Sequence, residues 1–239
     1  MKKNQKKPLY FTIIGILLIF CTSYSQSSNE TSVYNWFDKN IGIESLDFEN
    51  GPAHLNFDKT VNNNNRYYIS EDFKKGSINY NEQDYFDLLL NYDTYNDEVI
   101  LKPYGESNTT KINIIKENLR YFQIGNEKFI KIETLNVPNF RKGYYEQLSV
   151  GNDMTFFIKH YKVKKKINKD EIDLVEFIPK YEFIIIKDNK PFLVNTKKEI
   201  LALFPNNKRK INDFYLLHRD LKSDNPALFT KNLLQYINN

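Results

Sequence analysis

Histidine and cysteine, the side chains most often used for metal and nucleophilic chemistry, are scarce in this sequence. His54, His160 and His218 stand far apart, and no H-x-x-x-H or H-E-x-x-H pair occurs, although a helical zinc site requires one. No G-x-S-x-G occurs either, so a hydrolase nucleophile elbow is not predicted. Any catalysis would use dispersed Asp, Glu, Ser or Tyr side chains. We therefore assign no catalytic, cofactor-binding or metal-ligating residue and expect no cofactor.

Carboxylates gather in the run from Asp93 to Asp97, which reads DTYND. A calcium loop of the EF-hand type needs Gly at its sixth position and Glu at its twelfth, and here those positions hold Glu98 and Tyr104. Asp and Asn are favoured in tight turns because their side chains bond to nearby backbone groups. We interpret the run as a turn between two strands, with a calcium site of another kind as the alternative.

A basic stretch is followed within a dozen residues by an acidic one. Opposite charges on neighbouring strands attract each other, so a solvated hairpin is the simplest interpretation. Contact with an anionic component of the cell envelope is the alternative. The basic residues are Lys159, His160, Lys162, Lys164, Lys165, Lys166 and Lys169, and the acidic ones are Asp170, Glu171, Asp173 and Glu176.

Residues 218–225 read HRDLKSDN and resemble the catalytic loop of protein kinases, H-R-D-L-x-x-x-N. In that family Asp220 would be the base, Asn225 would hold a metal ion, and Lys102 would contact phosphate. The family pattern also has a glycine-rich loop before that lysine and Asp-Phe-Gly after the catalytic loop, and this sequence has neither. We interpret the stretch as a helix end, a polar turn and a helix start at Asn225-Pro226. Asp220 and Lys102 are predicted not to be a catalytic pair.

The first 25 residues have the order of a secretory signal. Four Lys precede an apolar run from Leu9 to Phe20, and the small residues Ser23 and Ser25 precede Gln26. The run is shorter than the ~20 residues that span a bilayer core. We predict export and cleavage before Gln26. A lipid on Cys21 is one alternative, although the large Phe20 before it disfavours this, and an uncleaved anchor is another.

Removal of residues 1–25 changes the charge and the cysteine content. The remaining 214 residues lose four Lys and no acid, so 30 basic side chains balance 30 acidic ones. A basic nucleic-acid footprint and a polybasic membrane anchor are therefore not predicted. Cys21 is the only cysteine, so the mature chain would lack disulfides, thiol catalysis and Cys-ligated metals. We expect a periplasmic or secreted protein with no transmembrane span in its mature part.

Short runs rich in Tyr, Phe, Ile and Val favour strands. The clearest has Phe86, Leu88, Leu90 and Tyr92 on one face, a period of two that is typical of a half-buried antiparallel strand. Tight turns separate the runs. The expected strands cover residues 77–80, 85–92, 98–104, 111–116, 119–124, 128–134, 143–150, 154–164, 181–187 and 191–195.

The apolar period changes near residue 196. Thr196 and Glu199 form a capping box before a short helix that Pro205 ends. Helical stripes then follow over residues 207–217 and from Pro226 onward. Because the strands precede the helices, we predict an α+β fold. It is a mostly antiparallel sheet or open barrel of roughly ten strands followed by two or three short C-terminal helices. Residues 26–239 would form a single β-rich domain with a helical part over 196–239.

The last predicted hairpin needs cover on both of its faces. Phe183 and Ile185 lie on one face and Ile184 and Ile186 on the other, and a strand that is apolar on both faces is buried on both. We predict that the C-terminal helices provide this cover. The candidate contact residues are Phe214, Leu217, Phe229 and Leu233.

Several short segments along most of the predicted mature chain form a pattern of strand cores, turns and helix starts. They are Asn50-Gly51, residues 76–80 (GSINY), 90–93 (LNYD), Tyr95, 97–99 (DEV), 143–148 (GYYEQL) before Gly151, Phe204-Pro205, Lys208, Ile211 and Phe214-Tyr215. In these segments the chain resembles a group of secreted proteins of unknown function from low-GC Gram-negative bacteria. The resemblance implies an extracytoplasmic β-rich protein and brings no activity or site residues.

Three functions fit the composition and the absent motifs. The first is a non-catalytic binding or envelope-associated protein, which neutral charge and many aromatic side chains favour. The second is a carrier of an apolar molecule in a barrel-like fold, which requires an unfilled apolar interior. The third is a hydrolase with paired carboxylates, which requires two acids in opposed environments within one cleft.

Overall fold

The computed structural model describes residues 32–36, 46–62, 64–103, 110–150, 154–169 and 172–238. The chain divides into two compact units, residues 1–45 and 46–239. In the first unit, residues 32–36 form a short helix. The predicted signal, with Cys21 and the cleavage position, lies outside the described residues. All elements below belong to the second unit.

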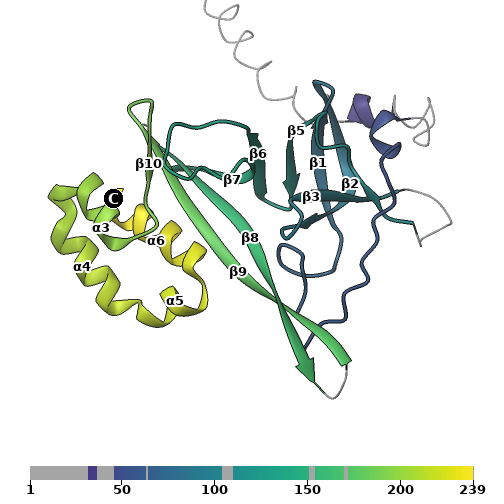
Figure 1. Ribbon diagram of the computed structural model, residues 1–239. Helices are drawn as coiled ribbons and strands as arrows, with labels where there is room; N and C mark the ends of the chain where they lie inside the picture. Colours follow the sequence, from purple (N-terminus) through teal and green to yellow (C-terminus); the bar gives the residue numbers. More distant parts are fainter. Residues whose placement is uncertain are drawn as a thin grey trace, which may run out of the picture. The chain divides into compact units, whose positions relative to one another are not determined.

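The second unit is built on one antiparallel sheet of ten strands in the order β10-β9-β8-β7-β6-β5-β1-β2-β3-β4 (Figure 1). The two ends of this order, β10 and β4, do not pair with each other, so the sheet is open. The strands are β1 (Lys74–Tyr80), β2 (Gln83–Asp93), β3 (Glu98–Lys102), β4 (Ile112–Asn113), β5 (Leu119–Ile124), β6 (Glu127–Ile132), β7 (Gly143–Val150), β8 (Met154–Lys169), β9 (Ile172–Lys187) and β10 (Lys190–Leu193).

Helices follow the sheet, which confirms the predicted α+β order. The side chains of Thr196 and Glu199 form the predicted capping box at the start of α3. The helix α5 was not predicted: it occupies the stretch interpreted as a polar turn, and its Leu221 packs against the helical core. The helical elements are η3 (Asp47–Glu49), α3 (Lys197–Leu203), η4 (Pro205–Asn207), α4 (Lys208–Leu217), α5 (Arg219–Asp224) and α6 (Pro226–Asn238).

A β-bulge in β2 shifts the predicted alternation of its side chains. Gly76 of β1 pairs with Leu88, but two residues on Ile78 pairs with Tyr85, so β2 holds one extra residue. Asp87 takes a positive φ of 57° there. Tyr85 therefore shares the buried face with Leu88, and the prediction that Phe86 does so is wrong. A bulge changes the period of two locally, and the residue pattern alone does not reveal it.

The first core lies over the strands β1, β2, β3, β5, β6 and β7 and combines aromatic with aliphatic side chains. The rings of Phe122 and Phe129 stack with centroids 4.7 Å apart, and the ring of Tyr92 lies 5.2 and 5.3 Å from them. Phe48 of η3 closes the core with an edge contact to Tyr85 at 4.7 Å. The aromatic rings of these residues pack together over this part of the sheet.

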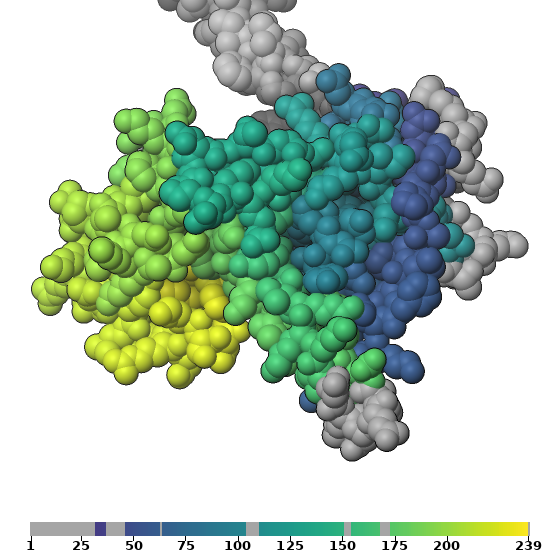
Figure 2. Space-filling view, viewed as in Figure 1, coloured from purple at the N-terminus to yellow at the C-terminus, as the bar shows by residue number. Residues whose placement is uncertain are grey.

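The second core joins the helices to one face of β7, β8 and β9. Phe214, Phe229 and Leu233 are buried in it, as predicted. Leu217 is not, because 76 % of it is exposed. On a helix with 3.6 residues per turn, Leu217 points about 120° away from the buried Ile211. Figure 2 shows the helices, green-yellow to yellow, gathered on one side of the green strands.

The opposite face of the last hairpin is covered by a loop and not by the helices. Ile184 packs there with Tyr145 and Phe157, beneath the apolar side chains of Leu135 and Phe140. The expectation that the C-terminal helices cover both faces is therefore wrong. The loop between β6 and β7 was not considered as cover because its apolar residues show no period.

Strands β8 and β9 are longer than predicted and pair over 16 residues each (Figure 1). The segment before β1 that comprises residues 58–62 and 64–67, called the N-terminal segment below, lies along the first half of β9. The backbone of Val175 donates to Lys59 at 2.9 Å and accepts from Val61 at 3.2 Å. The amide side chain of Asn64 donates to the carbonyl of Phe177 at 2.9 Å. The backbone N–H of Thr94, in the turn between β2 and β3, donates to the carbonyl of Arg66 at 3.1 Å, so the same segment also lies next to this turn.

Candidate functional site

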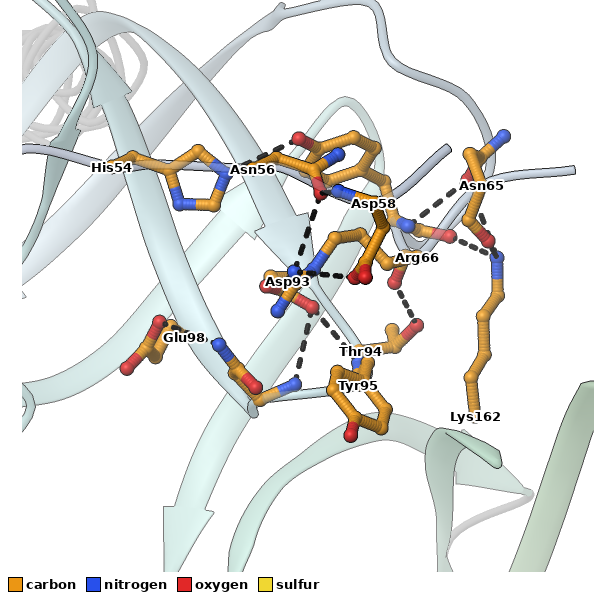
Figure 3. Close-up of polar contacts among 12 residues, drawn as sticks. His54, Asn56, Asp58, Asn65, Arg66, Asp93, Thr94, Tyr95, Glu98 and Lys162 are labelled. Atoms are coloured by element: carbon orange, nitrogen blue, oxygen red, sulfur yellow. Dashed lines mark hydrogen bonds and ion pairs between the residues drawn. The ribbon is translucent and has the colours of Figure 1, made fainter. Parts of the chain in front are cut away.

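The turn between β2 and β3 holds a buried ion pair instead of a free acidic cluster. Arg66 Nε donates to Asp93 Oδ2 at 2.7 Å, and 7 % and 0 % of the two side chains are exposed. The other oxygen of Asp93 accepts the backbone N–H groups of Tyr95 at 3.0 Å and Asn96 at 3.1 Å. Figure 3 shows these contacts around Arg66 and Asp93. Both carboxylate oxygens of Asp93 are therefore already bonded, one to the guanidinium of Arg66 and the other to backbone N–H groups of its own turn.

Arg66 is held by rings and by a second acid. Its guanidinium lies 5.1 Å from the ring centroid of Tyr95 and 5.8 Å from that of Phe177, and its Nη1 lies 3.4 Å from Asp58 Oδ2. Lys164 of β8 also pairs with Asp58. This contact network (Arg66, Asp93, Asp58 and Lys164) ties the N-terminal segment, the turn and the long hairpin together.

Lys162 is fixed by backbone acceptors in the same region. Its Nζ donates to the carbonyls of Asn65 and Tyr67, both at 2.6 Å (Figure 3). Burial lowers the pKa of Lys162 to about 8, and Asp93 opposes this effect. The basic stretch therefore supplies anchors for the N-terminal segment.

His54, Asp93 and Glu98 form a group whose ligand atoms lie within 4.8 Å of one another. A metal ion there would have to break existing bonds. His54 Nδ1 lies 2.8 Å from Asn113 Oδ1, and its Nε2 lies 3.1 Å from the hydroxyl of Tyr67. Arg66 already neutralises Asp93, and a guanidinium beside a cation would repel it. The residues fit a hydrogen-bonded network better than a metal centre.

Asp97, at the end of the same turn, accepts bonds from a different set of donors. Its Oδ1 lies 2.6 Å from the hydroxyl of Tyr92 and 2.5 Å from Lys159 Nζ, and its Oδ2 pairs with Lys116. Lys159 also donates to the carbonyl of Tyr144 at 3.1 Å, and only 2 % of its side chain is exposed. Burial lowers the pKa of Lys159, while Asp97 raises it. The two acids of the turn therefore do not converge on one ligand.

Glu146 forms a second buried cluster, between the sheet and α6. Its Oε1 lies 2.5 Å from Lys231 Nζ, and its Oε2 lies 2.7 Å from His160 Nε2. Burial opposes ionisation of Glu146, but His160 and Lys231 outweigh burial and lower its pKa. Burial lowers the pKa of His160 despite the carboxylate. Because both pKa shifts are downward, His160 is neutral at pH 7 and donates a hydrogen bond to an ionised Glu146.

These clusters correct the interpretation of the basic stretch as a solvated hairpin. Lys159 and His160 are buried, and Lys162 and Lys164 have the fixed partners described above. Among the described residues of this stretch, Lys165 and Lys166 are exposed, and the ion pair of Lys165 with Glu176, at 4.0 Å, fits the solvated hairpin. A lone charge within an apolar run, such as Glu146 after two Tyr, is the sequence signal that could have indicated these pairs. A charged side chain on a buried strand is almost always paired.

A pocket of about 640 Å³ opens on the helices α3, α4 and α5. Its lining includes Lys197, Tyr215, Arg219, Lys222 and Ser223. The kinase-like motif thus supplies three of these side chains, although its Asp220 is not one of them. Lys102 lies on β3, near the end of the sheet farthest from β9 and β10, so the structure does not bring it to Asp220.

Within the described ranges, no helix is both long and apolar enough to cross a membrane.

The chain matches no protein-family model, no curated protein sequence and no solved structure.

Proposed function

We propose that this chain is a non-catalytic binding protein that works outside the cytoplasm, in the cell envelope or beyond it. The buried side chains that could act as acids or bases support binding over catalysis. Asp97, Glu146 and His160 each hold short bonds to fixed neighbours in the interior. A general acid or base must exchange a proton with a substrate, and groups committed in this way are poorly placed to do so.

The observation that carries the proposal is the pocket on the helices. Lys197, Arg219 and Lys222 line it. Within the part of the chain that the structure describes, none of these three forms an ion pair. The buried cations Arg66 and Lys159 of the sheet region are, in contrast, paired with acids. Unpaired cations in a concave site are what a binding surface for an external ligand requires.

The two alternative functions receive less support. A carrier of an apolar molecule requires an unfilled interior, whereas the stacked rings of Phe122 and Phe129 occupy the first core. A carboxylate hydrolase requires two acids that share a cleft. Asp93 and Asp97 share a turn, but each has its own cationic partners. Neither arrangement supplies the feature that its function needs.

Export is part of the proposal and rests on the N-terminal sequence alone. The Lys-rich start, the apolar run to Phe20 and Ser25 before Gln26 support a cleaved signal. N-terminal analysis of protein secreted by an expression host should show that residues 1–25 are missing. Retention of Met1 in a folded cytoplasmic pool would contradict export, whereas a lipid on Cys21 would contradict only the cleavage position.

Native mass spectrometry of exported protein tests the binding function. We expect a small molecule that stays bound with unchanged mass during incubation. The double variant Arg219→Gln/Lys222→Gln should lose it, and the control Lys198→Gln/Lys208→Gln should keep it, because those two exposed lysines lie on α3 and α4 outside the pocket lining. Conversion of the bound molecule into a product would contradict a non-catalytic role. A ligand-free preparation would contradict binding at the pocket.

A further inference from the structure

The pocket on the helices carries an excess of positive charge. Lys197 comes from α3, and Arg219 and Lys222 come from α5. Asp213 is the acid of the lining, and it faces Arg209 one helical turn away, at 3.9 Å. Three cations against one acid leave two positive charges in the lining. An anionic group on a ligand complements this excess.

Tyr215, another residue of the lining, contacts two of these cations. Lys197 Nζ lies 4.9 Å and Lys222 Nζ lies 5.2 Å from its ring centroid, so one ring holds ammonium groups from two helices. The ring is itself fixed by an edge contact with Phe229, at 4.9 Å. Such cation–π contacts limit the positions that a lysine can take. The same ring therefore restrains both ammonium groups before any ligand binds.

The remaining lining has the hydrogen-bonding groups and the apolar edge that a phosphorylated organic molecule needs. Arg219 has a planar guanidinium that can bond two phosphate oxygens at once, and Ser223 adds a hydroxyl donor to the same lining. Burial raises the pKa of Tyr215 to about 12, so its hydroxyl stays neutral at physiological pH and does not repel an anion. Leu216 gives the pocket an apolar side.

We propose that this pocket binds the phosphate group of a phosphate monoester or diester, with Arg219, Lys197 and Lys222 as the anion-binding residues. The inference rests on the proposed function, because it names the ligand class of the same site. The phosphate can belong to a small phosphorylated molecule or to a phospholipid headgroup, which present the same chemistry. A phosphate monoester carries about −1.5 to −2 at pH 7 and a diester carries a single negative charge, so both complement the positive lining.

Titration calorimetry with phenyl phosphate and flotation with vesicles test the proposal. The vesicles contain phosphatidylglycerol or, as a control, phosphatidylcholine. We expect binding in at least one anionic arm. Arg219→Gln/Lys222→Gln should weaken it about tenfold or more, since a charge-assisted hydrogen bond contributes roughly 1.5–3 kcal/mol. Lys198→Gln/Lys208→Gln removes the same charge outside the pocket and should leave the affinity unchanged. Circular dichroism should show that both variants are folded.

The two arms distinguish the sources of the phosphate. Binding to phenyl phosphate assigns a small molecule, and binding only to phosphatidylglycerol vesicles assigns a headgroup. Absence of binding in both arms, or equal weakening by the two double variants, would overturn the proposal. If the exported protein still retains a different ligand through the pocket, the phosphate assignment fails while the proposed binding function stands.

Discussion

At the scale of single residues, the interior of this protein is held together by charges whose partners are far away in the sequence. Lys159 is separated from Asp97 by 62 positions, and Lys231 from Glu146 by 85. The sequence indicates that Asp93 and Asp97 share a turn, and it does so correctly. It does not indicate their partners, because no local period connects residues on different strands. The ion pairs therefore became visible only with the fold.

The ion pair of Asp97 with the buried Lys159 gives the first residue-scale prediction. Asp97→Asn should lower the free energy of unfolding by about 3–5 kcal/mol, because it leaves the ammonium of Lys159 buried without a counter-charge. Urea unfolding followed by circular dichroism measures this loss. The matched control is Asp87→Asn, whose partner Lys75 lies at 3.8 Å and is 78 % exposed in its side chain. An exposed pair contributes about 0–1 kcal/mol. Equal losses in both variants would contradict the structural role of Asp97.

His160 gives a prediction on pH. Burial lowers its pKa from the ordinary value of 6.5, and the charges of Lys231 and Lys159 add to this effect, while Glu146 opposes it. The unfolded chain therefore binds a proton that the folded chain does not, so stability is full above about pH 6.5 and falls as pH drops from there. His160→Gln keeps a donor for Glu146 and should flatten the decline between pH 7 and 5. Thermal unfolding across this range measures it, and an unchanged slope in the variant would contradict the assignment.

At the scale of elements, the period of the apolar residues predicts most strands and the helix starts. Strands β5 and β7 have the predicted bounds, and the capping box of Thr196 begins α3 as predicted. The first half of β9 was missed because Pro179 and the charged residues around it hide the strand pattern. Tertiary pairing with β8 decides this segment, and a single-strand pattern cannot show such pairing.

The start of β7 gives an element-scale prediction. Gly143 has a φ of 126°, and a Cβ atom there would collide with the carboxylate of Asp97 and the ammonium of Lys159. Gly143→Ala should therefore destabilise the protein by about 2–4 kcal/mol, through backbone strain and a displaced ion pair. The control is Gly125→Ala, where φ is 61° and the nearest atom is Glu127 Oε2 at 3.4 Å. Strain of about 1–2 kcal/mol is expected there. A smaller loss at Gly143 than at Gly125 in urea unfolding would contradict the close contact.

At the scale of the whole molecule, the fold class was predictable and the cover of the sheet was predictable only in part. Alternating strands followed by helical stripes indicate a sheet with segregated helices. Which loop covers which face depends on three-dimensional proximity, so Phe140 against Tyr145 was not foreseen. The pocket was missed for the same reason. Its cations come from two helices, and Arg219 and Lys222 stood in a motif whose known role does not apply here.

The C-terminal helices are predicted to be part of one folding unit with the sheet. Phe156, Ile158 and Ile185 lie under them, each at most 1 % exposed. Removal of residues 196–239 would expose this apolar face and also take Lys231 away from the buried Glu146. We expect the shortened protein to aggregate, because exposed apolar patches of this kind drive association. Size-exclusion chromatography with light scattering measures the outcome.

A point variant tests the packing of the helices against the sheet without shortening the chain. Leu233→Ala in the full chain removes a fully buried side chain of α6 that packs in the second core. It should lower the free energy of unfolding by about 2–5 kcal/mol in a single cooperative transition. That transition should include the sheet, because helices and strands share one core. If the protein without residues 196–239 is soluble, monomeric and cooperatively folded, and Leu233→Ala melts the helices alone, the helices form a separate module.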